Sequence, residues 1–139
     1  MYEMRANFGA AAYSGSARAY SNISIESNVM SANPHQLIVL LFDGIDVAIR
    51  TARLHMESSN LPAKGKAISK AIDIINQGLI AAIDDDRGGE ISQNLGSLYR
   101  YVIDILLEAN LRNDMEKLDE AAGLLSDIGS AWREIGSQQ

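Results

Sequence analysis

The sequence contains no cysteine, and this absence excludes disulfide bonds, thiol catalysis and a zinc site built from cysteine ligands. Aromatic residues make up only 6% of the 139 residues, while alanine, leucine and isoleucine are frequent, and such a composition favours helices that pack on helices. No apolar run reaches the length of about 18 residues that a membrane-spanning helix needs. The N-terminus also lacks the long apolar region of a signal peptide. We therefore expect a cytoplasmic protein that does not insert into a membrane.

Positive charge is also scarce. The chain has 18 acidic and 12 basic side chains and a net charge of −6, and its lysines and arginines are not clustered. Binding to phosphate groups needs concentrated basic residues, so nucleic acid is not expected as a partner. The length suits a single domain with one hydrophobic core.

The motifs of common catalytic and metal-binding sites are absent as well. The two histidines, His35 and His55, belong to one predicted helix and lie roughly 30 Å apart, too far to share a metal ion. Residues 84–90 resemble the first half of a calcium loop, but the position where such a loop needs a bidentate glutamate is Leu95. No nucleophile elbow and no phosphate-binding loop occurs. We expect neither an enzyme nor a bound cofactor or metal.

The stretch NPHQLIVLLFDGIDVAIR, residues 33–50, is the most informative part of the sequence. Its Asp-Gly pair after an apolar run is typical of a hairpin, but Asn33 and Pro34 form a helix start, and polar residues then recur with spacings of three and four. The pattern predicts a helix over residues 34–57, with Gly44 beside the core. Its solvent-exposed face is predicted to contain Asp43, Asp46, Arg50, Arg53 and Glu57. Asp46–Arg50 and Arg53–Glu57 are expected ion pairs on this face.

Three further helices follow, joined by short loops. They are predicted over residues 63–84, 90–112 and 114–135, and a capping box of Asn113 and Glu116 begins the last one. Four amphipathic helices with short connections predict an all-α, antiparallel four-helix bundle. The expected core stripes of these three helices are Ile68, Ile72, Ile75, Leu79 and Ala82; Ile91, Leu95, Leu98, Val102, Ile105 and Ala109; and Leu118, Ala121, Leu125, Ile128, Trp132 and Ile135.

The N-terminal residues differ from the rest. Residues 1–20 are rich in glycine, alanine and serine without sustained periodicity, so we expect a mobile segment there. Residues 21–136 would form the helical domain. Tyr20, Ile23, Ile25 and Val29 place apolar groups in a polar stretch, which predicts a short extra element that lies on another surface.

The first predicted helix carries more apolar surface than a bundle core requires. Residues 37–49 are apolar over far more than the usual arc of about 100°, and contiguous apolar surface usually marks an interaction site. Three interpretations are open at this point. The chain could be a helical adaptor or chaperone, a self-associating bundle such as a homodimer, or a histidine phosphotransfer domain with His55 as the phosphorylated residue.

Three blocks of sequence, in this order, resemble the FliS family of flagellar secretion chaperones. They are ANPHQLIVLLFDG, GGEISQNLGSLYRYV and LLEANLRND. The likeness extends from about Tyr20 to Trp132, and three spaced blocks are more specific than any one of them. The chain departs from the family at Asn33, where the family usually has serine, and its leading segment is longer than the family core requires. Phe42 stands where tyrosine is also common.

The resemblance implies a helical bundle that binds the C-terminal segment of flagellin, which is disordered in the free monomer. Covering this segment would prevent premature polymerisation and keep flagellin competent for type III flagellar export. The implied partners are flagellin, the export apparatus and other flagellar regulators. The client would lie in apolar grooves as short helices and extended pieces. The expected contacts are Tyr20, Ile23 and Ile25, from a segment that can cover the groove before the client arrives, and Ile38, Phe42, Ile45, Asn94, Tyr99, Tyr101 and Asn110, of which the aromatic residues would be anchors and the amides would bind client backbone.

Overall fold

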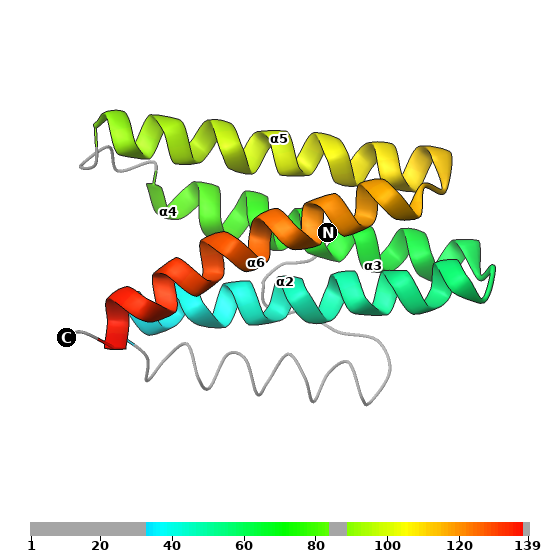
Figure 1. The fold of residues 1–139 in the computed structure, drawn as a ribbon, viewed down its shortest axis with the longest axis horizontal. Helices are drawn as coiled ribbons and strands as arrows, with labels where there is room; N and C mark the ends of the chain where they lie inside the picture. The colour runs from blue at the N-terminus through cyan, green and yellow to red at the C-terminus, as the bar shows by residue number, and fades with distance from the viewer. Residues whose placement is uncertain (1–32, 84–88, 138–139) are drawn as a thin grey trace. The chain divides into compact units, whose positions relative to one another are not determined.

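The computed structural model describes residues 33–83 and 89–137 of the chain. The described residues form almost entirely helices (Figure 1), and no strand occurs among them, which confirms the all-α prediction. None of the described helices is long and apolar enough to cross a membrane. The helices are α2 (Pro34–Glu57), α3 (Leu61–Ile74), the π-helix η1 (Ile75–Ile80), the single turn α4 (Ala81–Ile83), α5 (Glu90–Arg112) and α6 (Met115–Ser137).

The chain divides into two compact units, Met1–Leu40 and Leu41–Gln139. Within the second unit, α3, η1 and α4 follow one another without a break, so four helical rods pack together. Neighbouring rods run in opposite directions, because the residues that meet across each contact occur in opposite order along the two rods. This confirms the antiparallel four-helix bundle for the second unit. The contacts are Leu41 with Gly78 and Gly44 with Ile74; Gly65 with Asn110 and Ile83 with Gly96; and Asp43 with Arg133 and Arg53 with Asp119.

Helix α2 begins at the expected residue, with a more complete cap than expected. The side chain of Asn33 accepts a hydrogen bond from the backbone N–H of Gln36 at 2.8 Å, and the Gln36 side chain accepts one from the Asn33 N–H at 3.2 Å. This reciprocal pair satisfies donors that a helix start otherwise leaves open. Further along, both expected ion pairs are present, at 2.9 Å for Asp46–Arg50 and 3.6 Å for Arg53–Glu57.

Helix α3 begins at Leu61, two residues before the predicted start, because the side chain of Asn60 accepts a hydrogen bond from the Ala63 N–H at 3.2 Å. Its continuation as the π-helix η1 was not predicted. A π-helical turn holds one more residue than an α-helical turn, so it shifts the phase of every later position. Consequently Leu79 and Ile80 are both buried, and Ala82, which we predicted as a core residue, is exposed.

The turn between α5 and α6 also differs from the prediction. Asn113 does not cap α6, because its backbone is left-handed (φ 54°) and ends α5 instead. The cap is Asp114, whose carboxylate accepts hydrogen bonds from the backbone N–H groups of Glu116, at 3.0 Å, and Lys117, at 3.3 Å. Two capping residues therefore share the turn, one for each helix.

Replacing the cap tests this assignment. Asp114→Ala should lower the free energy of unfolding by about 1 kcal/mol, because two N–H groups at the start of α6 lose their acceptor. Asp127→Ala, also on α6 but exposed within the helix, should change it by less than about 0.5 kcal/mol. Urea denaturation of both variants measures the difference. Equal effects of the two substitutions would contradict the cap.

The core of the second unit is apolar and close-packed. Predicted stripe residues such as Ile68, Val102 and Leu118 are fully buried. Ile91 and Ile135 were predicted in the core but are exposed. Both lie near a helix end, and a stripe position is buried only where a neighbouring helix lies opposite it. The largest fully buried side chains are Tyr99, Ile45, Ile68, Ile75, Leu79, Leu106, Leu118 and Val102.

Candidate functional site

Exposed apolar side chains form a line on the outside of α2. Val47 and Leu54 are 62% and 65% exposed, and they lie seven residues apart, so two helical turns bring them onto the same line. Thr51 lies between them, and its hydroxyl donates a hydrogen bond to the Val47 carbonyl at 2.8 Å. The hydroxyl is thus satisfied within the helix. We call Val47, Thr51 and Leu54 the α2 outer stripe, and it faces away from the buried residues of the same helix.

A second group of exposed apolar side chains lies at the start of α3 and near the end of α5, the two segments that meet at Gly65 and Asn110. Leu61 lies one turn before Gly65 on α3, while Leu107 and Leu111 lie within a turn of Asn110 on α5, and Gly65 meets Asn110. Leu61 and Leu107 are about half exposed, and Leu111 is 84% exposed. We call these five residues the α3/α5 corner. It combines apolar side chains with one amide.

A buried lysine links the two helices of the α3/α5 corner. Lys64 is only 4% exposed, and it is the one charged side chain that is buried in the described part of the chain. Its ammonium group donates hydrogen bonds to the Asn110 carbonyl at 2.9 Å and to the Asn113 side-chain oxygen at 3.2 Å. A buried charge is tolerated only when it is paired with such groups. The cation also lies at the C-terminus of α5, where the helix dipole favours positive charge.

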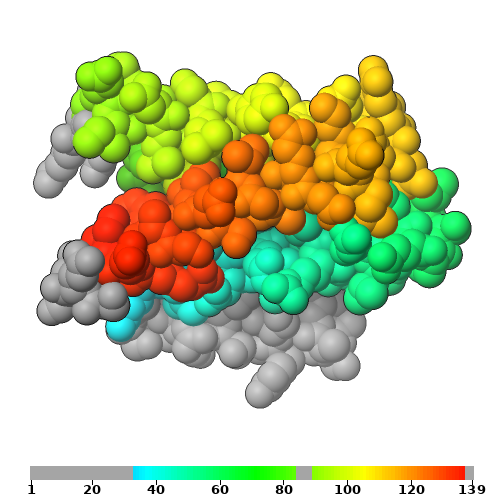
Figure 2. Space-filling model, viewed as in Figure 1, coloured from blue at the N-terminus to red at the C-terminus, as the bar shows by residue number. Residues whose placement is uncertain are grey.

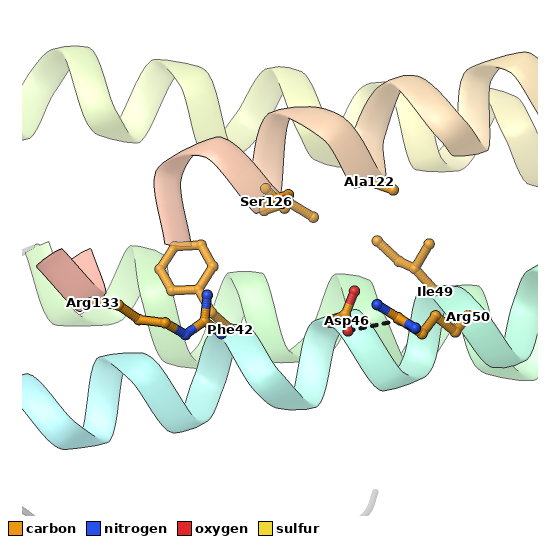
Figure 3. Close-up of a pocket in the computed structure, with 8 residues that line it drawn as sticks. Phe42, Asp46, Ile49, Arg50, Ala122, Ser126 and Arg133 are labelled. Atoms are coloured by element: carbon orange, nitrogen blue, oxygen red, sulfur yellow. Dashed lines mark hydrogen bonds and ion pairs between the residues drawn. The ribbon is translucent and has the colours of Figure 1, made fainter. Parts of the chain in front are cut away.

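A hollow of about 260 Å³ lies between α2 and α6. On the face shown in Figure 2, α6 lies between α5 and the part of α2 that belongs to the second unit. Ion pairs bracket the hollow, one between Asp43 and Arg133 at 2.5 Å and one between Arg53 and Asp119. Figure 3 shows Ala122 and Ser126, two small residues of α6 that line the hollow. The lining consists of Phe42, Asp46, Ile49, Arg50, Ala122, Leu125, Ser126 and Arg133. Ligand pockets usually measure about 300–1,000 Å³, so the hollow suits a single side chain better than a cofactor.

Three predicted contact residues lie in the core of the bundle. Phe42, Ile45 and Tyr99 are each less than 5% exposed, and the rings of Phe42 and Tyr99 pack together with centroids 6.4 Å apart and an interplanar angle of 56°. Gly129 of α6 approaches the Phe42 ring closely. The surplus apolar surface of α2 is therefore found at the α2 outer stripe. Contact of these three residues with flagellin stays a prediction, and it requires that the core opens.

The phenol of Tyr99 has the most perturbed environment among the tyrosines that the structure describes. Burial raises the pKa of Tyr99 from 10.0 to about 12, and a hydrogen bond with the Trp132 side chain acts in the opposite direction. Burial disfavours the charged phenolate, whereas an N–H donor stabilises it. Tyr99 therefore stays neutral in the folded protein well above the pH at which an exposed tyrosine ionises.

This pKa predicts a loss of stability in alkali. Below about pH 10 the phenol is neutral in both states and contributes no pH dependence, but above it the unfolded chain ionises first. The free energy of unfolding should therefore fall by up to about 1.4 kcal/mol per pH unit from this residue. Urea unfolding between about pH 9 and about pH 12 should show a shallower decline for Tyr99→Phe than for the wild type. Identical slopes would contradict the assignment.

Tyr101 and Asn94 lie on a different face of α5. Both are exposed, and the Tyr101 hydroxyl donates a hydrogen bond to Glu120 of α6 at 2.8 Å. This bond, with the negative charge of Glu120, raises the pKa of Tyr101. Lys117 joins the same cluster, 3.9 Å from Glu120. Asn110, by contrast, is half-buried on the side that faces α3. The structure thus distributes the predicted aromatic and amide contacts over separate faces.

The remaining predicted contacts lie in the first unit. Tyr20, Ile23 and Ile25, together with the predicted N-terminal segment of residues 1–20, lie outside the described residues. Ile38 is half-buried.

Sequence reasoning missed Lys64 and the exposed leucines of α5. Lys64 precedes the buried Ile68 by four residues, so the spacing placed it on the core face, and this was the available signal. Leu107 and Leu111 also lie four residues apart, outside the predicted core stripe of their helix. An apolar pair at this spacing beside a complete core stripe marks surplus surface.

Comparison with known proteins gives a consistent result. The sequence model of the family described as "Flagellar protein FliS" matches residues 16–139. A protein of Salmonella typhimurium named "Flagellar secretion chaperone FliS" is 54% identical over 118 residues, which cover 85% of this chain and 87% of that protein. Its namesake from Escherichia coli is 44% identical over 84% of this chain and 86% of its own length. The Pseudomonas aeruginosa "Flagellar secretion chaperone FliSB" is 47% identical over 83% and 90%.

Proposed function

This chain belongs to the FliS family of flagellar secretion chaperones, and we propose that the client it holds is flagellin, bound through its C-terminal segment. The chain is a chaperone and not an enzyme, so its task is to bind and release. Binding in the cytoplasm would keep flagellin from polymerising and leave it competent for export. The complex would then pass to the flagellar export apparatus.

The observation that carries this proposal is the amount of apolar surface that the bundle leaves exposed. The α2 outer stripe and the α3/α5 corner expose large aliphatic side chains in the second unit although the core beneath them is complete. Exposed apolar side chains that gather in this way usually mark an interaction site. A disordered client can order itself on such a surface, because the burial of its own apolar residues offsets the loss of chain entropy.

The chemistry of the two surfaces suits different parts of a client. The α2 outer stripe presents a line of side chains along one helix, against which the apolar face of a short client helix can pack. The α3/α5 corner adds the Asn110 amide, which can bind client backbone. Asn94 and Tyr101 would make further polar contacts at the edge of α5. We also propose Ile38, Tyr20, Ile23 and Ile25 of the first unit as client contacts.

The proposal is tested by binding to two forms of flagellin. Full-length flagellin should be retained by the immobilised chain, and flagellin that lacks its C-terminal segment should not. Light scattering measures the mass of the free chain, because in a homodimer the second copy would cover apolar surface that is assigned here to the client. Retention of neither form would refute the proposal. Equal retention of both would show that the C-terminal segment is not the part recognised.

A further inference from the structure

We infer that Lys64 and Gly65 hold the Asn110 amide in a preset position, where it forms hydrogen bonds with the backbone of the bound client. The inference rests on the proposed function, because it names the polar recognition point within the apolar α3/α5 corner. Lys64 and Gly65 are positioning residues in this account, and Asn110 is the contact. Lys64 and Gly65 both lie on α3, and each contacts Asn110 of α5 directly.

Lys64 fixes the backbone of Asn110. Its ammonium group binds the Asn110 carbonyl and the Asn113 side chain together, and so ties the last turn of α5 to the start of α3. A helix end normally frays because its last carbonyls lack partners. Here one of these carbonyls is bound by a buried cation, which is a stronger partner than a neutral donor. The direction in which the Asn110 side chain leaves the helix is therefore fixed.

Gly65 provides the space in which the amide lies. A Cβ atom at Gly65 would lie 3.6 Å from the Asn110 side-chain oxygen and 3.9 Å from its nitrogen. These are ordinary contact distances, so the amide rests against the bare backbone of α3 without strain. Because glycine has no side chain, no methyl group lies between the amide and the backbone of α3. An alanine here would place a methyl group on the amide without a clash.

Among the described residues, none forms a hydrogen bond with the Asn110 side-chain amide. Asn110 is half-buried. A partly desolvated amide is costly unless its donor and acceptor are used. Leu61, Leu107 and Leu111 are exposed on the two helices that meet here, and a client that covers them would exclude water. An amide that is enclosed in this way gains most from a partner in the client.

The partner that fits is peptide backbone in a non-helical conformation. A carboxamide offers one acceptor and two donors, which match the N–H and C=O groups of a peptide. In the middle of an α-helix these groups are already paired, so a helix would leave the amide unsatisfied. The client segment at the α3/α5 corner is therefore extended or is the end of a helix. A client helix packs elsewhere, for example on the α2 outer stripe.

Gly65→Ala separates this role from a purely structural one. The substitution should raise the urea midpoint, because alanine is the better helix former, yet weaken flagellin binding by about five-fold, since the methyl group covers the amide. The matched control is Gly123→Ala in α6, where a Cβ would meet nothing within 4 Å. This control should raise the midpoint similarly and leave the affinity unchanged. A Gly65→Ala chain that is stabilised and binds as well as wild type would overturn the inference.

A double-mutant cycle tests the link between Lys64 and Asn110. Lys64→Met should weaken binding in the wild-type background and have little further effect in an Asn110→Ala background, because the contact it positions is already gone. Independent, additive losses would contradict the link. If Lys64→Met does not fold, the Gly65→Ala and Asn110→Ala pair takes its place in the same cycle. Wild-type chain that fails to bind flagellin would refute the proposed function instead, so the two failures are distinguishable.

Discussion

The double substitution Leu107→Ala and Leu111→Ala should reduce the affinity for flagellin by at least about 100-fold, which corresponds to about 2.8 kcal/mol. Both side chains are at least half exposed in the free chain, so their removal costs little in the folded state. Alanine is also an excellent helix former. The free energy of unfolding should therefore change by less than about 0.5 kcal/mol. Calorimetric titration gives the affinity, and urea denaturation gives the stability.

The control for this pair is Ile91→Ala with Ile135→Ala. These isoleucines are also exposed, but they lie outside both proposed surfaces. Their replacement removes a similar amount of exposed apolar surface and should leave the affinity unchanged. If both double variants weaken binding alike, the effect is one of general hydrophobicity and the α3/α5 corner is not the specific surface. A parallel pair, Val47→Ala with Leu54→Ala, measures the share of the α2 outer stripe.

Phe42→Ala should have the largest effect on stability, a loss of about 3–5 kcal/mol. Its ring is 4% exposed and packs against Tyr99 and Gly129, so truncation leaves a cavity between α2 and α6. Thermal and urea unfolding measure the loss. Val47→Ala on the same helix serves as the control, with a change below about 0.5 kcal/mol.

The same substitution decides whether Phe42 is a core residue or a docking residue. A docking residue would lose affinity when truncated and keep its unfolding midpoint. The structure predicts the opposite order, in which the midpoint falls and any loss of affinity follows from the fraction of unfolded chain. A variant as stable as the wild type that does not bind flagellin would contradict the placement of Phe42 in the core.

The helices of this fold follow from local rules that the sequence displays directly. Asn33 and Pro34 indicate the start of α2, and the spacing of charged residues up to Glu57 indicates its solvent-exposed face. Both features depend only on residues within one or two helical turns. The bundle follows from four such helices with short connections. These features need no knowledge of which helix packs on which.

Features that depend on contacts between helices were not predictable in the same way. The π-helix shifted Ala82 out of the core and brought Ile80 into it, and a constant helical period has no means of indicating this change. On a helical projection Tyr99 lies beside the predicted core stripe of α5, yet the positions of α2 and α6 bury it. Asn113 and Asp114 are both capping residues by type, and only the left-handed backbone of Asn113 decides between them.

The sequence predicted that the first helix would have surplus apolar surface, but not which of its residues would expose it. Surplus apolar surface on the first helix was expected, and it exists, but at Val47 and Leu54 in place of Phe42 and Ile45. Which side of an apolar helix faces outward depends on the crossing of its neighbours, and a single helical pattern does not contain that information. Lys64 was missed because a lysine is usually assigned to the surface, although its spacing from Ile68 placed it inside.

Methyl-resolved NMR of the chain, free and bound to the C-terminal segment of flagellin, shows whether the exposed apolar side chains are the ones that flagellin covers. We expect the methyl signals of Val47, Leu54, Leu61, Leu107 and Leu111 to shift on binding, since these side chains become covered. Signals of the fully buried Leu79, Leu106 and Leu118 should stay nearly unchanged. A spectrum in which the buried leucines shift while the exposed ones do not would contradict the account, and so would the absence of any shift.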